Sequence, residues 1–245
     1  MRGVGAFVRA CLLGASTVSV CVNAASADLA IDDEKTALFF SGGDLWRHGS
    51  FSYGGLLWSP RGLDREGFTL KLLLGGGRYR YLSGALGNTQ VTGSQVIFFA
   101  LPGWRFHKDR LTLSVFAGLD IQQHDLTPDD PSSSLRGTKL GIRGGFDLWF
   151  EPDPLTMIGA DVSISSIGPS YSARLAFGWR LPEGFYAGPE IGGFADGNDY
   201  SQLRFGLHVT GLKTDNLEWS AGFGWAFDND ERDSFYGRLG VFVRR

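Results

Sequence analysis

Histidine is the side chain in this sequence best suited to act as a general base near neutral pH, and it occurs four times. His124 is followed directly by Asp125, and a carboxylate beside an imidazole can activate a water molecule. His208 stands four residues after Arg204, so both lie on one face if the segment is a strand. The other two, in expected turns, are His48 and His107. A two-residue match without a further catalytic partner is weak, so we expect no catalytic residues and no enzyme.

The elements that must position these side chains are strands with strict alternation. In residues 201–212 (SQLRFGLHVTGL), apolar side chains alternate with polar ones and glycine. Because the side chains of a strand point to opposite faces in turn, this segment has one apolar face and one polar, charged face. The pattern recurs along the chain behind an export signal, as expected for a barrel with lipid outside and a polar lumen inside. The sequence therefore predicts an all-β fold, a transmembrane outer-membrane antiparallel β-barrel of about 12 strands.

The start of the chain has the form of a signal peptide. Arg2 and Arg9 precede a mostly apolar segment, and an A-x-A motif ends at Ala27. Cleavage there removes both cysteines, Cys11 and Cys21, and leaves 21 Lys and Arg against 26 Asp and Glu, a net charge of −5. We therefore expect no disulfide and no basic surface for nucleic acid, and a location in the outer membrane of a Gram-negative cell. The expected organisation is a signal peptide over 1–27, a short periplasmic lead-in over 28–36 and a barrel domain over 37–245.

Turn-forming residues divide the barrel domain into strands of a length that can cross an outer membrane. With the N-terminus in the periplasm, short turns should follow the even-numbered strands, and longer acidic loops such as 123–135 should follow most odd-numbered ones. Trp58, Trp104 and Trp179, near the ends of even-numbered strands, are expected to form an interfacial girdle. The strands are expected at 37–46, 50–58, 67–80, 91–105, 110–122, 136–150, 155–165, 170–181, 184–194, 200–212, 216–227 and 234–244.

Alternation also assigns a mixed set of charges to the lumen. A charge there must be paired or hydrated, because leaving it desolvated and alone costs several kcal/mol. The charges can form a salt-bridge network that fills the barrel, or line a conduit that inward glycines such as Gly222 keep open, and the sequence leaves both readings standing. We expect no metal site and no cofactor. The expected members of this polar network are Lys139, Arg143, Asp147, Arg174, Arg180, Glu190, Arg204, His208, Glu218 and Arg238.

A small set of aromatic residues at strand ends is expected to gather near the outer rim of the barrel. Aromatic faces stack on sugar rings, so these residues are candidates for contact with a glycan. An interfacial belt of aromatic side chains explains the same positions equally well. The candidates are Trp46, Tyr81, Phe194 and Tyr200.

Particular stretches of the chain resemble a known family. Residues 42–81 (GGDLWRHGSFSYGGLLWSPRGLDREGFTLKLLLGGGRYRY), 139–152 (KLGIRGGFDLWFEP) and 188–212 (GPEIGGFADGNDYSQLRFGLHVTGL) are similar to the bacterial cellulose biosynthesis protein BcsS family. The resemblance extends over essentially the whole mature chain. It implies an exported protein associated with cellulose production, and it brings no catalytic residues that could be carried over.

The expected function is that of a non-enzymatic accessory barrel in cellulose biosynthesis, export or surface anchoring. An intact cellulose chain needs a sizeable pore, which a charged lumen does not favour, so we expect an accessory or anchoring role before that of the main export channel. The alternatives are a small porin-like diffusion channel and a surface hydrolase. Expected partners are outer-membrane lipid and lipopolysaccharide, together with cellulose or components of the cellulose synthase complex, and no nucleic acid.

Overall fold

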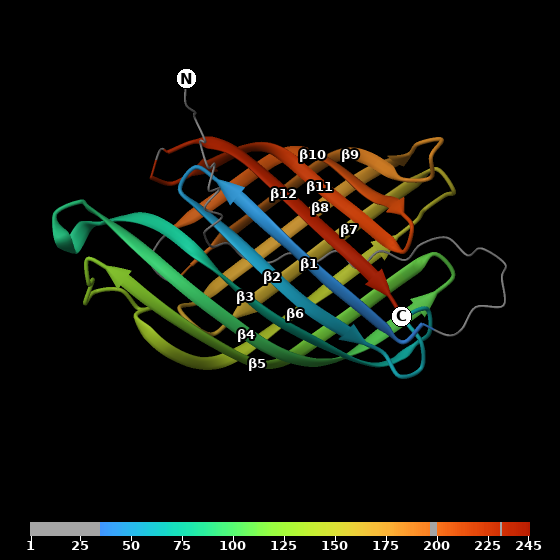
Figure 1. The fold of residues 1–245 in the computed structure, drawn as a ribbon, viewed down its shortest axis with the longest axis horizontal. Helices are drawn as coiled ribbons and strands as arrows, with labels where there is room; N and C mark the ends of the chain where they lie inside the picture. Colours follow the sequence, from blue (N-terminus) through green and yellow to red (C-terminus); the bar gives the residue numbers. More distant parts are fainter. Residues whose placement is uncertain (1–34, 197–199, 231) are drawn as a thin grey trace, which may run out of the picture.

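The computed structural model describes residues 35–196, 200–230 and 232–245, which form a closed barrel of 12 antiparallel strands (Figure 1). Each strand pairs with the next along the chain, and β12 pairs with β1, so the predicted barrel is confirmed. The expected signal peptide, its cleavage site and most of the lead-in lie outside the described residues. The strands are β1 (Ala37–Trp46), β2 (Gly49–Trp58), β3 (Gly67–Ser83), β4 (Thr89–Lys108), β5 (Leu111–Thr127), β6 (Gly137–Phe150), β7 (Thr156–Ser165), β8 (Ser170–Arg180), β9 (Tyr186–Ala195), β10 (Ser201–Thr214), β11 (Leu217–Asp228) and β12 (Ser234–Arg244), with a short 3-10 turn η1 (Gly84–Leu86) after β3.

The barrel has two ends with different connections. β1 begins and β12 ends at what we call the terminal end, where the N–H groups of Thr36 and Ala37 both donate to the Arg245 carbonyl at 2.8 Å. The opposite end, called the far end, carries the connections that follow the odd-numbered strands. Residues 109–110 and 215–216 make tight turns at the terminal end, whereas residues 128–136 form a longer loop between β5 and β6 at the far end.

Burial follows the predicted alternation along the strands. In β10, Arg204 and His208 are buried in the lumen, while Phe205 and Leu207 are exposed on the outer face. The girdle tryptophans Trp58, Trp104 and Trp179 are likewise exposed on the outside, near the terminal end. Among the described residues, no helix is long and apolar enough to cross a membrane.

The ranges expected for β3, β4 and β5 were too short, because these strands continue further toward the far end. Residues 123–127, expected in the outer loop, belong to β5 and pair with β4, with His124 opposite Gln95. The prediction that His124 lies in that loop is therefore wrong, since this side chain is 2% exposed inside the barrel. The physical reason is that the ladder of backbone hydrogen bonds continues as long as the partner strand supplies donors and acceptors, whatever the local polarity.

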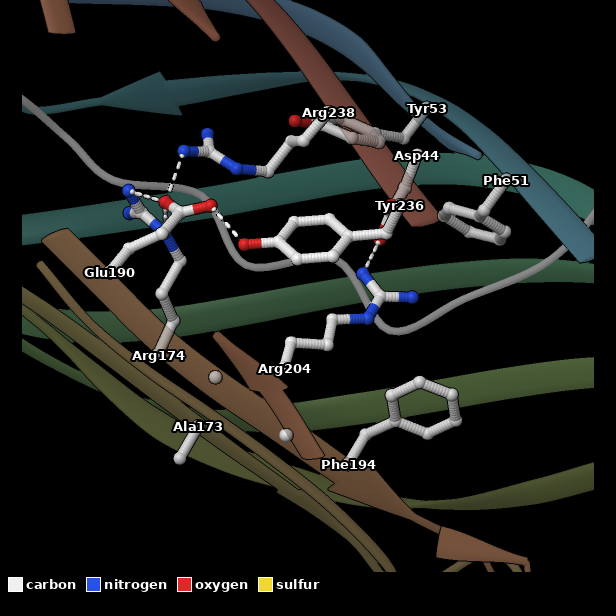
Figure 2. Close-up of a pocket in the computed structure, with 12 residues that line it drawn as sticks. Asp44, Phe51, Tyr53, Ala173, Arg174, Glu190, Phe194, Arg204, Tyr236 and Arg238 are labelled. Carbon is white, nitrogen blue, oxygen red and sulfur yellow. Dashed lines mark hydrogen bonds and ion pairs between the residues drawn. The ribbon is translucent and has the colours of Figure 1, made fainter. Parts of the chain in front are cut away.

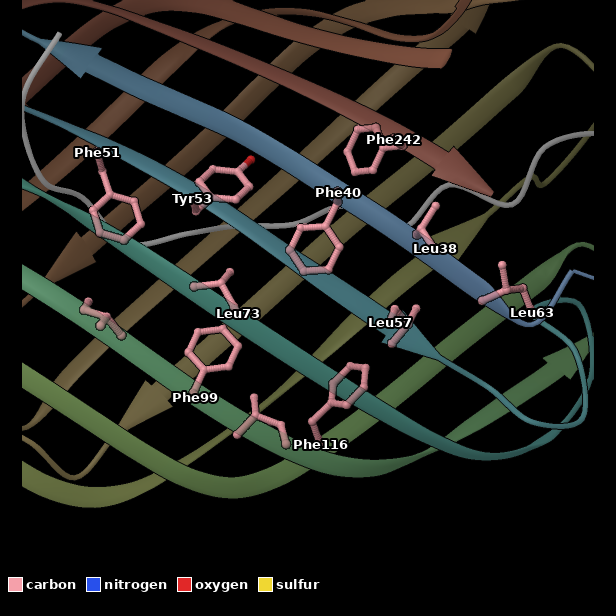
Figure 3. Close-up of a cluster of buried hydrophobic side chains, with 12 residues drawn as sticks. Leu38, Phe40, Phe51, Tyr53, Leu57, Leu63, Leu73, Phe99, Phe116 and Phe242 are labelled. Atoms are coloured by element: carbon pink, nitrogen blue, oxygen red, sulfur yellow. The ribbon is translucent and has the colours of Figure 1, made fainter. Parts of the chain in front are cut away.

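The first five strands fill their side of the lumen with apolar side chains (Figure 3). Phe51 shows how closely they pack, since a Cβ on Gly75 of the neighbouring strand would lie 2.4 Å from its ring. The sequence left undecided which side chains of the first strands face the lumen, because the side chains on their lipid face are apolar as well. The buried members of this apolar cluster are Leu38, Phe40, Phe51, Tyr53, Leu57, Leu63, Leu73, Ile97, Phe99, Leu101, Phe116 and Phe242.

One member of the apolar cluster comes from a connection and not from a strand. Leu63, in the segment 59–66 between β2 and β3, is buried in the cluster, and its N–H donates to the Lys35 carbonyl at 2.8 Å. The Arg105 guanidinium donates to the Leu63 carbonyl, and Asp64 lies 3.7 Å from Arg244. The connection 59–66, at the terminal end and within the stretch of family resemblance, therefore covers the apolar side of the lumen.

Candidate functional site

The charges of the later strands are organised around Glu190 on β9 (Figure 2). Arg174 Nη2 and Arg238 Nη2 lie 2.7 and 2.8 Å from Glu190 Oε2. The Tyr236 hydroxyl donates to Glu190 Oε1 at 2.8 Å. Gly222 leaves room for this arrangement, because a Cβ there would lie 2.3 Å from Glu190 Oε1. This inward glycine accommodates the charge network and does not hold the lumen open.

Ion pairs also join the later strands to the first five. Each pair places a buried acid against a buried base, which compensates the cost of removing both from water. Arg204 is held further by aromatic faces, since its guanidinium lies 5.4, 5.5 and 5.0 Å from the ring centroids of Trp46, Phe194 and Tyr236. The pairs are Lys71–Asp147 at 2.8 Å, Arg143–Asp120 at 2.8 Å and Arg204–Asp44 at 2.6 Å.

Four predicted members of the polar network lie apart from these ion pairs. His208 Nε2 donates to the Phe177 carbonyl at 3.1 Å, and its Nδ1 lies 3.0 Å from the Thr210 hydroxyl. Arg180 lies over the Tyr186 ring at 5.9 Å, near the terminal end. Lys139 is half-buried opposite Gln122, and Glu218 is 4.0 Å from Arg244 Nε. The structure therefore places all ten predicted residues on lumen-facing positions. The closest ion pairs, at 2.6–2.8 Å, involve Arg143, Asp147, Arg174, Glu190, Arg204 and Arg238.

A cavity lies in the lumen at the far end, and we call it the rim cavity. All four candidates for glycan stacking line it, although they come from β1, β3, β9 and the connection after β9. Phe194 stands between two of them, with ring centroids 6.4 Å from Trp46 and 5.7 Å from Tyr200. The rings of Tyr81 and its neighbour Tyr79 stack 6.2 Å apart at an interplanar angle of 23°. The rim cavity thus has aromatic side chains on two sides.

Two glycines allow these rings to lie against the inner wall of the barrel. A Cβ on Gly49 would lie 2.3 Å from the indole of Trp46, and a Cβ on Gly93 would lie 2.3 Å from the ring of Tyr79. Any other residue would push the rings toward the axis of the barrel. The missing side chains therefore keep space in the rim cavity.

A chain of hydrogen bonds runs from this cavity into the wall of the barrel. The Tyr79 hydroxyl is 3.0 Å from His124 Nδ1, and His124 Nε2 is 3.0 Å from Gln122 Oε1. Because an amide oxygen can only accept, Nε2 carries the proton and Nδ1 accepts from Tyr79. Gln122 Nε2 then donates to Asp120 at 2.9 Å. Asp125, the sequence neighbour of His124, lies on the opposite, exposed face of β5 and cannot act with it.

Tyr79 and Gln122 are lining residues that the sequence analysis did not select. Tyr79 is two residues from Tyr81 on β3, and Gln122 is two residues from His124 on β5. Residues two apart on a strand face the same side, so the alternation could have identified both as lumen-facing. Both lie within the strands expected at 67–80 and 110–122, and the boundary error concealed only His124, which it left in a loop.

The rim cavity also contains polar atoms that the protein itself does not satisfy. Within the described parts of the chain, Trp46 Nε1 and His48 Nε2 are buried without a hydrogen-bond partner, and both residues line the cavity. Buried polar atoms of this kind are normally satisfied by water or a ligand. The described residues contain no cluster of three or more side chains suited to hold a metal ion.

The cavities inside the barrel are small. The rim cavity offers about 70 Å³ to the centres of water molecules, and a second cavity beneath it, lined by Glu190 and Arg204, offers about 50 Å³. A single water needs about 10–15 Å³ by this measure, so each space holds several waters. Phe194 lines both cavities and stands between them.

Solved structures of outer-membrane barrels share this fold. The chain is similar to the COG4313 outer membrane channel from Pseudomonas putida F1, with a TM-score of 0.56 and 12% identity over 89% of this chain and 100% of that one. It is also similar to the translocator domain of the autotransporter NalP from Neisseria meningitidis, with a TM-score of 0.50 and 12% identity over 89% and 91% of the two chains. At such identities the similarity concerns the fold alone.

Among curated proteins, none matches the chain. The family model described as cellulose biosynthesis protein BcsS matches residues 38–245, which is the whole barrel apart from its first residue. The resemblance noted in the sequence is thereby confirmed. The chain belongs to the cellulose biosynthesis protein BcsS family.

Proposed function

We propose that this protein is an accessory outer-membrane barrel that holds a segment of β-glucan in its rim cavity and so anchors cellulose at the cell surface. The observation that carries the proposal is the meeting of Trp46, Tyr81, Phe194 and Tyr200 at one cavity from separate parts of the chain. Aromatic rings present broad apolar faces, which suit the C–H faces of glucose rings. The unsatisfied polar atoms of Trp46 and His48 suit the hydroxyl groups.

The proposal needs the far end to lie outside the cell. Single-chain bacterial barrels have short periplasmic turns and longer extracellular loops. The tight turns 109–110 and 215–216 at the terminal end and the loop 128–136 at the far end support this orientation, although the connection 59–66 at the terminal end is longer than the turn 47–48 at the far end. The rim cavity then opens toward the cell surface, where the polymer is deposited.

The filled lumen supports anchoring over passage of the polymer. Lys71–Asp147 and Arg204–Asp44 reach from the first strands to the later ones, and Phe194 separates the rim cavity from the space beneath it. A glucan chain would have to displace these paired charges, at a cost of several kcal/mol for each pair broken.

The first test is a clean deletion in the source bacterium, with cellulose at the surface measured against cellulose retained in the envelope. We expect a several-fold loss of surface polymer with synthase levels unchanged, and recovery on complementation. Complementation with Phe194→Ala should fail in large part, because it removes the central ring of the rim cavity. Trp225→Ala, on the exposed outer face of β11, should restore the polymer and is the matched control.

Binding is tested directly with cellohexaose and the purified barrel in detergent, by calorimetry. We expect Phe194→Ala to raise the dissociation constant for cellohexaose at least tenfold, while Trp225→Ala leaves it unchanged. Unchanged cellulose after deletion, together with no binding of cellohexaose, would exclude the anchoring role.

A second candidate is a small diffusion channel, favoured by the position of the two cavities one beneath the other with Phe194 between them. Planar-bilayer recordings distinguish the two functions. Anchoring predicts no steady conductance from the wild-type barrel, whereas a channel predicts open steps that grow when Phe194 is replaced by alanine. We propose no enzymatic role, since His124 and Asp125 face opposite sides of β5.

A further inference from the structure

We propose that the outside of β1–β3, at the far end, binds the phosphate groups of lipopolysaccharide. Three exposed arginines gather there: Arg47 in the turn between β1 and β2, and Arg78 and Arg80 on β3. Tyr79 between them lines the rim cavity, so alternation turns Arg78 and Arg80 to the outer face. We call these three residues the arginine patch.

Backbone pairing brings the members of the arginine patch together. Arg78 lies opposite Ser50 of β2, and the Arg80 N–H donates to the His48 carbonyl at 2.9 Å. Arg47 is the chain neighbour of His48. Since neighbouring strands lie about 5 Å apart, the three guanidinium groups can converge on one ligand.

The arginine patch has no counter-charge of its own within the described parts of the chain, where no carboxylate lies within 4.0 Å of any of its guanidinium groups. Other arginines at the far end are paired: Arg136 with Asp129 at 2.9 Å and Arg232 with Asp230 at 2.6 Å. A guanidinium matches a phosphate with two parallel hydrogen bonds, so unpaired arginines of this kind suit a phosphate ligand.

Three arginines lie close enough to His48 to act on its charge. Burial, and after it the charge of Arg232, lowers the pKa of His48, and Arg47 and Arg80 add to the effect against the opposing charge of Asp228. The imidazole therefore stays neutral at physiological pH and leaves the arginines as the charges that a ligand meets.

The position of the arginine patch suits a lipid headgroup. Leu74, four residues before Arg78 on the same outer face of β3, is an exposed apolar side chain closer to mid-barrel, so the arginines stand toward the edge of the apolar band. The row between them consists of Gly43, Ser52 and Gly76, paired across β1, β2 and β3. Small side chains in that row let acyl chains approach the barrel wall while their headgroup phosphates meet the arginines.

Lipopolysaccharide is the phosphate-bearing lipid of the leaflet that faces outward, and the far end faces outward in the orientation proposed above. The inference rests on that orientation and not on glucan binding. The two can therefore fail separately, because Arg47 and Arg78 do not line the rim cavity, although Arg80 borders it as well.

The test measures binding of purified lipopolysaccharide to the delipidated barrel in mild detergent. We expect the double variant Arg47→Gln/Arg78→Gln to bind at least tenfold more weakly than wild type, and enzymatically dephosphorylated lipopolysaccharide to bind wild type equally weakly. Arg136→Gln, which removes a paired arginine at the same end, should bind like wild type. Affinity for cellohexaose should be the same in all of these proteins.

Phosphatidylglycerol vesicles and inorganic phosphate separate the sources of phosphate, and we expect weak binding of the vesicles and none of the free ion at millimolar concentration. Equal affinity of wild type for intact and dephosphorylated lipopolysaccharide would overturn the inference, and this arm does not depend on any variant folding. Equal affinity of the double variant and wild type, or tighter binding of the vesicles than of lipopolysaccharide, would overturn it as well.

Discussion

Strands β1–β5 fill their side of the lumen mainly with apolar rings and aliphatic side chains, whereas β6–β12 carry most of the buried charges, which pair with one another or with charges on the first five strands. On the apolar side, the burial of Phe51 and Leu57 away from water is enough by itself to stabilise the folded state. On the charged side, Arg174 and Glu190 hold their places only because each has a partner. Side chains fill the lumen on both sides, so the spaces available to a ligand lie at the rim and on the outer surface.

The two sides meet at a boundary that shares the features of both. Lys71 pairs with Asp147 and also lies 5.0 Å from the Phe116 ring centroid. Arg143 pairs with Asp120 and lies 5.2 Å from that of Phe99. The cations thus complete an ion pair on one side and cover an aromatic face on the other. The barrel therefore behaves as a packed core. Its apolar side accepts any well-fitting apolar neighbour, whereas each charge on its other side requires a partner of opposite charge.

The largest effect should follow from opening a hole in the apolar side. Phe51→Ala removes a ring that is 1% exposed and packed on Gly75, so the free energy of unfolding should fall by about 3–5 kcal/mol. Urea unfolding in lipid vesicles, followed by tryptophan fluorescence, measures it. Phe39→Ala, on the lipid face of β1 and 49% exposed, is the matched control and should cost less than half as much. Equal losses would mean that the lumen of this side is not packed.

On the charged side, the loss of one anion should take the nearest carboxylate from two cations, of which Arg174 keeps Asp161 at 3.8 Å. Glu190→Gln removes the shared partner of Arg174 and Arg238, and we expect a loss of about 3 kcal/mol in the same unfolding measurement. The further change Arg238→Gln should recover part of that loss, because one of the two charges that Glu190 compensated is then gone. A double variant less stable than Glu190→Gln would contradict the pairing.

A smaller effect is expected at the rim, where hydrogen bonds from Tyr81 and Ser83 of β3 help to tie the loop 128–136 to the barrel. The Tyr81 hydroxyl donates to Asp130 at 2.9 Å, and its removal in Tyr81→Phe should weaken loop docking by about 1.5 kcal/mol. Tryptic cleavage after Arg136, within this loop, should then become about tenfold faster. Tyr171→Phe, on the exposed outer face of β8, should leave the cleavage rate unchanged.

The smallest effect is a pH dependence of the same loop. Hydrogen bonds, chiefly from the Ser132 hydroxyl, lower the pKa of Asp130 from its ordinary value. Because the pKa is lower in the docked loop than in a free one, docking is favoured above the ordinary value of 3.8 and is lost as the pH falls below it through the docked value. A spin label on Pro131→Cys should therefore be immobile at pH 6 and gain mobility below about pH 4.

Tyr81→Phe should make the label mobile at a higher pH than in the wild-type background, because one of the bonds that lower this pKa is gone. Both natural cysteines, Cys11 and Cys21, lie in the expected signal peptide, so the introduced cysteine is suited to specific labelling. Label mobility that is independent of pH would exclude Asp130 as the residue that holds the loop.

Alternation, together with the export signal and the turn-forming residues, was enough to predict the barrel, its approximate strand number and the facing of the later strands. Alternation assigns Arg204 to the lumen because both of its sequence neighbours, Leu203 and Phe205, are apolar and must face lipid. In the first strands this contrast is missing, since the lumen there is apolar too, and the sequence could not say which way Phe99 points.

The local sequence also could not place the end of β5. Residues 123–127 are polar and look like a loop, but β4 offers them backbone partners, and the strand continues with His124 inside the barrel. The family resemblance was readable in the residues themselves, as the match over 38–245 confirms. It carried no information about which residues meet in space.

What the sequence by itself determined is therefore the class of fold, the family and the side of the wall on which most later-strand charges lie, because each of these depends on neighbours along one strand. Only the tertiary structure decided that Glu190 joins Arg174 and Arg238, and that Trp46 and Phe194 meet at the rim cavity. Such contacts join strands far apart in the chain, and they depend on the register between strands and on closure of the barrel. No local pattern encodes these quantities, since they are set by the hydrogen-bond ladders of the closed barrel as a whole.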